Sequence, residues 1–158
     1  ITEHDIGPYV YPSDEQIEAL GVRGIYLSNF FYWDALEHAK MMHQKFDFGL
    51  HPGPREKTFI IHRQTDAHAN DVHDYLKYLK CGYGRATDDA SMEIRHGRMT
   101  REEGIELVRR YDSVRPTTLD TYLEFLQITE EDFYDWVEPM RDSEIWERDA
   151  SGGWVVTE

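Results

Sequence analysis

The stretch that organises the chain covers residues 77–95 and reads KYLKCGYGRATDDASMEIR. It predicts the basic end of one helix, a turn at Gly82 and Gly84, and the acidic start of the next helix. Lys77 and Lys80 stand in the last turn of the first helix, where the negative end of the helix dipole favours cations. A short piece of backbone thus brings cations, glycine amides and carboxylates close together.

Helical periodicity extends on both sides of this stretch. Two local signatures mark helix starts: Ser13 with Gln16, and Thr100 with Glu103, each form the pattern of a capping box. Residues 46–64 are too rich in glycine and proline for a helix, and we expect a loop there with an extended piece at 58–62. The expected helices cover residues 13–20, 33–45, 66–80, 88–96, 101–111 and 117–127, and a last one opens at residue 129.

Two segments favour β structure. Residues 22–28 are partly β-branched and aromatic and are the best candidate for a strand. Residues 145–148 and 154–156 flank a Ser-Gly-Gly turn and predict a small hairpin. The predicted fold is therefore mostly α, with one short strand and a C-terminal hairpin. We divide it into a helical domain at 1–142 and a hairpin tail at 143–158.

Composition limits the classes of function. The 158 residues carry a formal charge of −14, which argues against broad nucleic-acid binding because phosphate contacts need a basic surface. No apolar run approaches the roughly 18 residues of a membrane-spanning helix, and no leader resembles a signal peptide. The single cysteine, Cys81, fits a reducing compartment. We expect a cytoplasmic protein that works without nucleic acid or membrane partners.

The central turn is a candidate anion site. The amides of Gly82 and Gly84 lie beside Lys80 and Arg85, which is how backbone and cations cradle phosphate groups. A purely structural origin is equally open at this point, because cations at one helix end and carboxylates at the next helix start stabilise the helix dipoles.

Three other patterns carry weaker hypotheses. The cluster at His62, His68 and His73 contains metal-binding residue types, but its spacing matches no specific zinc pattern, so no metal site is predicted. Cys81 has no recognisable base beside it and is interpreted as a small residue at a tight turn. The run 151–153 lacks the helix that a phosphate loop needs behind its glycines, and a hairpin turn is the better interpretation.

Several runs resemble the N-acetyl sugar amidotransferases of bacterial lipopolysaccharide O-antigen and flagellar sugar biosynthesis. The resemblance covers most of residues 10–142 and corresponds to the C-terminal part of such proteins. It is carried by the runs YLSNFFYWD (26–34), KCGYGRATDDA (80–90), EIRHGRMTREEG (93–104) and Tyr111-Asp112.

The resemblance implies a fold and a chemistry. Members of this family have an N-terminal α/β ATP-pyrophosphatase domain with a phosphate loop, and they convert the acetamido group of a nucleotide-linked sugar to an acetamidino group. ATP and Mg²⁺ are the implied cofactors, and ammonia comes from a glutaminase and a cyclase-like partner. This sequence lacks the phosphate loop, so we expect the isolated chain to be inactive and ATP to bind mainly to an N-terminal domain.

The resemblance also suggests roles for individual residues. Lys80 and Arg85 would stabilise phosphate charge as the adenylate forms and breaks down, an electrostatic role. The remaining candidates would contact substrate, orient Arg85 and Arg95, or hold Mg²⁺. These substrate-site candidates are Asn29, Tyr32, Trp33, Gly82, Gly84, Asp88, Asp89, Glu93 and Arg95.

Two alternatives remain. The chain could be a non-catalytic helical module that docks partners or forms a homodimer, which the acidic, aromatic C-terminal third favours. It could also belong to a pyrophosphatase-type tRNA-modifying enzyme, which shares the activation chemistry but is disfavoured by the charge of −14. Light scattering tests the first alternative, and retention of tRNA at low salt tests the second.

Overall fold

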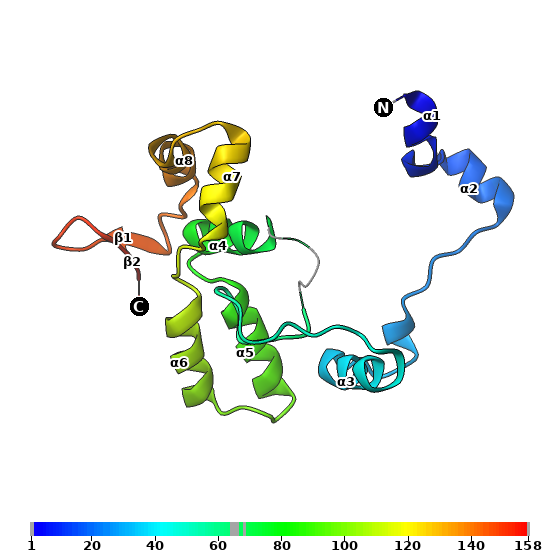
Figure 1. Cartoon of the computed structure of the whole chain (residues 1–158), viewed down its shortest axis with the longest axis horizontal. Helices are drawn as coiled ribbons and strands as arrows, with labels where there is room; N and C mark the ends of the chain where they lie inside the picture. Colours follow the sequence, from blue (N-terminus) through cyan, green and yellow to red (C-terminus); the bar gives the residue numbers. More distant parts are fainter. Residues whose placement is uncertain (1, 64–66, 68, 158) are drawn as a thin grey trace. The chain divides into compact units, whose positions relative to one another are not determined.

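A computed structural model describes residues 2–63, 67 and 69–157 of the chain. They form two compact units, residues 1–37 and residues 38–158, which are described separately here (Figure 1). The described part contains eight α-helices, three short 3₁₀ helices and one two-stranded sheet. The expected mostly-α fold with a C-terminal hairpin is confirmed. None of the described helices combines the length and apolarity needed to cross a bilayer.

The first unit consists of short elements joined by extended chain. They are α1 (Glu3–Ile6), a 3₁₀ turn (Gly7–Tyr9), α2 (Asp14–Leu20) and a second 3₁₀ turn (Leu27–Asn29). The predicted capping box of α2 is present, with Ser13 and Gln16 bonded to each other's backbone amides, and Gly21 ends the helix in the left-handed conformation at φ 63°.

The strand predicted at 22–28 is wrong. Its second half turns into the 3₁₀ segment Leu27–Asn29, where the amides of Phe30 and Phe31 donate to the carbonyl of Leu27 at 2.9 and 3.0 Å. A strand needs a neighbour to bond its backbone groups, and the described residues pair no other segment with this one. β propensity without a partner therefore did not form a strand.

The second unit is built on five helices. They are α4 (Ala69–Cys81), α5 (Arg85–Arg95), α6 (Arg101–Tyr111), α7 (Thr118–Leu126) and α8 (Glu130–Val137), followed by the 3₁₀ turn Glu138–Met140; α3 (Ala35–Phe46) precedes them. Capping boxes at Thr100 and Thr129 start α6 and α8. α5 starts three residues earlier than predicted, for a reason given below.

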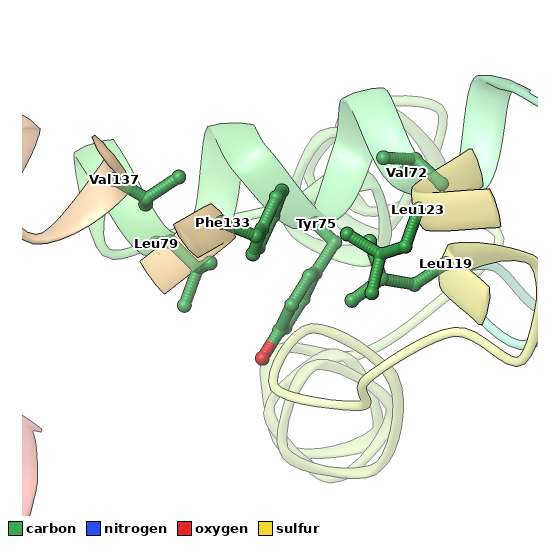
Figure 2. Packing of buried hydrophobic residues seen from close by; sticks show 7 residues of the cluster. All are labelled: Val72, Tyr75, Leu79, Leu119, Leu123, Phe133 and Val137. Carbon is green, nitrogen blue, oxygen red and sulfur yellow. The ribbon is translucent and has the colours of Figure 1, made fainter. Parts of the chain in front are cut away.

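The apolar core lies where α7 and α8 pack on α4. Its buried members are Val72, Tyr75, Leu79, Leu119, Leu123, Phe133 and Val137 (Figure 2). In that view the ring of Tyr75 lies between Phe133 and the two leucines of α7. A buried tyrosine hydroxyl needs a hydrogen-bond partner, and that of Tyr75 lies 3.0 Å from the Tyr134 hydroxyl. α4 is thereby fixed on one face.

α5 and α6 form an antiparallel pair beside this core (Figure 1). Gly104 allows their close approach, because a Cβ atom there would lie 2.9 Å from Cδ1 of Ile94. The small side chains of Ala86 and Ala90 are buried on α5. The pairing leaves the remaining face of α5 for polar contacts with other segments.

The C-terminal hairpin joins β1 (Trp146–Arg148) to β2 (Trp154–Val156) in antiparallel register. The carboxylate of Asp149 accepts hydrogen bonds from the amides of Ser151 and Gly153, both at 2.8 Å, which confirms the predicted turn. Trp146 is buried against Tyr78 of α4. The hairpin therefore packs near the C-terminal end of α4, next to the central turn.

Candidate functional site

The head of α5 is held by Asp112, which follows α6. Its carboxylate accepts hydrogen bonds from the amides of Gly84 (2.8 Å) and Ala86 (2.9 Å) and from the hydroxyl of Thr87 (2.6 Å). Asp112 is only 3% exposed. A buried carboxylate thus acts as the cap and complements the positive end of the helix dipole. This distant cap explains why α5 begins at Arg85 rather than near Asp88.

The two glycine amides of the central turn are already bonded within the chain. Gly84 donates to Asp112, and Gly82 donates to the carbonyl of Tyr78 at 2.8 Å, which closes the end of α4. The backbone role predicted for these glycines as an anion cradle is therefore filled by the protein's own groups. What they provide is the shape of the turn that sets Arg85 at the head of α5.

Gly82 cannot carry a side chain without strain. Its φ is +73°, and a Cβ atom would lie 2.5 Å from Cγ2 of Ile145, just before the hairpin. We expect Gly82→Ala to lower the free energy of unfolding by about 1–3 kcal/mol, through backbone strain and displacement of the hairpin. Urea unfolding measures this. Gly97→Ala is the matched control, because Gly97 also has a positive φ but no atom within 4 Å of its Cβ position; an equal loss in both variants would show that contact with Ile145 does not matter.

A buried lysine bonds the segment that follows α6. Lys57 is 0% exposed, and its amine donates to the carbonyls of Asp112 (2.6 Å) and Val114 (2.7 Å). The amine also lies 5.0 Å from the ring centre of Tyr75. The sequence analysis missed Lys57, which comes from the loop rich in glycine and proline, where a lone cation gives no periodic signal.

Burial lowers the pKa of Lys57 from 10.5 to about 8, although Asp112, Asp74, Asp71 and Glu56 oppose the shift. The folded protein therefore loses this proton at a lower pH than the unfolded chain. The free energy of unfolding therefore rises with pH over the range in which only the unfolded chain holds this proton. That range begins near pH 8.

We expect the free energy of unfolding to rise between pH 8 and 10, by up to about 1.4 kcal/mol per pH unit from this group. Above pH 10 the raised pKa of buried Tyr75 acts in the opposite direction. Urea unfolding at pH 7, 8, 9 and 10 measures the slope. Lys57→Met should remove this part of it, and identical slopes in the two proteins would contradict the account.

Arg85 is the predicted residue with the most defined geometry. Its Nε and Nη2 donate to the two carboxylate oxygens of Asp74 on α4, at 3.2 and 3.0 Å. The Asp74 side chain is fully buried, whereas that of Arg85 is 25% exposed. Desolvation by itself would lower the pKa of Arg85, but the bonds to Asp74 outweigh it and the pKa is raised. The guanidinium group is therefore a cation held by a buried carboxylate, on a side chain that is partly open to solvent.

One further predicted residue, Asp88, joins Arg85, and Lys77 bonds Asp88 in turn. Asp88 lies one turn along α5, with an oxygen 3.9 Å from Nη1 of Arg85 and 2.5 Å from the amine of Lys77. Lys77 also stacks over the ring of Tyr83, 4.3 Å from its centre. The sequence pattern found Arg85 and Asp88 as site candidates, whereas Lys77 was expected only at a helix end. Asp74 was not found, because the buried acid looked like one of several polar residues on α4.

Asp89 faces a different partner from Asp88. Its carboxylate accepts hydrogen bonds from the hydroxyl of Thr58 (2.6 Å) and from Nη1 of Arg63 (2.9 Å). Burial raises the pKa of Asp89, although Thr58, Arg63 and Arg85 act against the shift. The predicted residue Asp89 thus lies in the same network as Arg85, while Thr58 and Arg63 were not anticipated.

The other candidates have different surroundings. Lys80 is exposed and lines a groove of about 340 Å³ together with His73, Cys81, Val137 and Met140. Glu93 pairs with Arg98 at 2.7 Å between Oε1 and Nη2. Arg95 is exposed at the end of α5. The remaining candidates, Asn29, Tyr32 and Trp33, are exposed residues of the first unit.

The carboxylates near Arg85 are unsuited to Mg²⁺. Asp74, Asp88 and Asp89 are each bonded to a cationic side chain, and Mg²⁺ prefers carboxylates that face water. Among the residues with described positions, no group of three His, Cys, Asp or Glu side chains could hold a metal ion. His68 of the predicted histidine cluster lies outside those residues.

Comparison with known families places this geometry in context. The family model described as "LPS biosynthesis protein WbpG-like, C-terminal domain" matches residues 28–158. The chain belongs to this family. No curated protein matches the chain significantly. The match includes the whole second unit and the three aromatic-segment candidates Asn29, Tyr32 and Trp33.

The WbpG-like domain therefore contains an ordered polar network around the head of α5. It provides the guanidinium groups of Arg85 and Arg63, whose side chains are each 25% exposed. Such groups bind anions and stabilise developing negative charge. The family description assigns the domain to lipopolysaccharide biosynthesis, a role in sugar biosynthesis for the protein that contains it.

Proposed function

We propose that the chain is the C-terminal portion of an ATP-dependent N-acetyl sugar amidotransferase. The observation that carries this proposal is the guanidinium of Arg85, which donates two hydrogen bonds to fully buried Asp74 on a side chain that is partly open to solvent. It is supported by the family's role in lipopolysaccharide biosynthesis. A cation that is fixed before substrate arrives stabilises transition-state charge without reorganisation.

The proposed reaction has two steps. The acetamido oxygen of a nucleotide-linked sugar attacks the α-phosphorus of ATP, which forms an O-adenylyl imidate and releases pyrophosphate. Ammonia then attacks the imidate carbon, and AMP leaves with the former acetamido oxygen, so that an acetamidino group remains. Arg85 and Lys80 would bind phosphate oxygens that carry the negative charge in both steps.

The division of labour follows from what the chain offers. The amides at the central turn are bonded to Asp112 and Tyr78, and the nearby carboxylates are paired, so the described residues of the second unit form neither a phosphate loop nor a fitting Mg²⁺ site. We propose that ATP and Mg²⁺ bind to an N-terminal domain. We also propose that ammonia is delivered by a glutaminase and a cyclase-like partner.

A docking or dimerisation module is the second candidate. Most large apolar side chains of the first unit are exposed, including Tyr32 at 77% and Trp33 at 61%. On the second unit, Phe125 of α7 is 80% exposed. Exposed apolar surface of this extent marks interaction sites in soluble proteins.

The test uses the complete reading frame that contains this chain. ATP, ammonium and a nucleotide-linked diacetamido sugar are supplied, and AMP and pyrophosphate are measured. We expect release of both that depends on the sugar and that the isolated 158-residue chain does not catalyse. Absence of sugar-dependent release would contradict the amidotransferase, and light scattering that then shows self-association would favour the docking module.

A further inference from the structure

Three aspartates of the second unit are buried and each is paired with an arginine. Asp71 bonds Arg55 at 2.9 Å, Asp74 bonds Arg85 at 3.0 Å, and Asp89 bonds Arg63 at 2.9 Å. Ion pairs of this kind contribute little net stability, because removing both charges from water offsets much of their attraction. Stability alone is therefore a weak reason for three of them in one small unit, and perturbed charges gather at functional sites.

The three arginines differ in how far they reach the surface. The side chain of Arg55 is 9% exposed, so its donors point into the protein. Those of Arg63 and Arg85 are each 25% exposed. Arg55 therefore has a structural role, whereas Arg63 and Arg85 are partly open to solvent while buried carboxylates hold their guanidinium groups.

Arg63 and Arg85 face the same side of α5. Arg85 and Asp89 stand four residues apart on that helix, and residues at this spacing are neighbours on a helix surface. Arg63 bonds the carboxylate of Asp89 directly. Both guanidinium groups act on the pKa of Asp89, which agrees with their lying around one carboxylate.

Each arginine keeps donor capacity that the protein uses weakly. Nη1 of Arg85 is 3.9 Å from Asp88, beyond hydrogen-bond distance. Nη2 of Arg63 lies 3.1 Å from the thioether sulfur of Met92, a weak acceptor. Strong oxygen acceptors would be the natural ligands of such groups, and phosphate matches the planar fork of a guanidinium.

We propose that Arg63 and Arg85 form a two-arginine clamp for a diphosphate-bearing ligand. The clamp rests on the proposed function, because it assigns phosphate groups of the proposed reaction to this site. It adds Arg63 to the residues that bind them. Two fixed positive charges suit a diphosphate better than a single carboxylate. The buried aspartates hold both forks in place, so little side-chain freedom is lost when the ligand binds.

The test measures binding of inorganic pyrophosphate to the 158-residue chain by calorimetry at low salt, with acetate as the comparison anion. The variants are Arg63→Lys and Arg85→Lys, which keep a cation beside each buried aspartate but remove the fork. Arg109→Lys is the control, because Arg109 is exposed on α6, away from these contacts. We expect each clamp variant to weaken pyrophosphate binding at least about tenfold and the control to leave it unchanged.

Three results would overturn the clamp: no binding of pyrophosphate, equal binding of acetate, or normal binding by Arg63→Lys. If a variant does not fold, the Nε–H resonances of Arg63 and Arg85 in the wild-type chain decide, since both must shift when pyrophosphate is added. Turnover without this binding would remove the clamp and leave the amidotransferase proposal standing. Binding without turnover would keep the clamp and remove the amidotransferase.

Discussion

Replacing Asp112 with alanine is expected to lower the free energy of unfolding by about 3–5 kcal/mol, the range for removing one partner from a buried charged network. Its carboxylate is bonded to Gly84, Ala86 and Thr87 at the head of α5. Alanine would leave buried backbone donors without partners, and each such group is costly. The free energy of unfolding of a native domain is only about 5–15 kcal/mol in total. We therefore expect α5 to fray or the second unit to unfold.

Urea unfolding measures the loss, and hydrogen exchange at the α5 amides locates it. Asp112→Asn retains one oxygen acceptor and should lose less than the alanine variant. Asp135→Ala is the control, because Asp135 is exposed on α8 and surface changes of this kind stay within about 0.5 kcal/mol. An alanine variant as stable as the control would show that α5 does not depend on Asp112.

Replacing Arg85 with lysine in the complete enzyme is expected to lower the rate of sugar-dependent AMP release about 10²-fold. Lysine keeps a positive charge for buried Asp74, so the fold should survive. It cannot bond both Asp74 oxygens through a planar fork and still present a fixed edge to phosphate. The loss should therefore appear in the rate, with a melting temperature close to that of the wild type.

The comparison variants make this result decisive. Lys80→Ala should also reduce the rate, since Lys80 is an exposed amine on a groove that Lys77 also lines, whereas Arg109→Lys on α6 should not. A near-normal rate for Arg85→Lys together with a lowered melting temperature would mean that Arg85 only joins α5 to α4.

Local signals in the sequence predicted most of the helices. The capping boxes at Ser13, Thr100 and Thr129 depend on residues three apart and are present in the structure. The head of α5 could not be predicted in this way, because its cap is Asp112, 28 residues beyond Gly84. The strand at 22–28 failed for a similar reason, since strand formation depends on a neighbour that the sequence does not reveal.

The candidate site shows the same limit. The density of charged residues around the central turn pointed to the network that contains Arg85, Asp88 and Asp89. It did not show that adjacent Asp88 and Asp89 bind different partners, Lys77 and Arg63. Neither did it reveal Lys57, whose burial depends on the carbonyls that follow α6. Contacts between segments far apart in sequence decide which polar residues are structural and which face solvent.

Isotope tracing of the acetamido oxygen tests the central claim most directly. The complete enzyme would receive a nucleotide-linked sugar labelled with ¹⁸O in its acetamido group, together with ATP and ¹⁵N-ammonium. Mass spectrometry should find the ¹⁸O in AMP and the ¹⁵N in the product sugar, because adenylylation transfers that oxygen to the nucleotide. Unlabelled AMP, or a sugar that gains no nitrogen, would contradict the amidotransferase account of this domain.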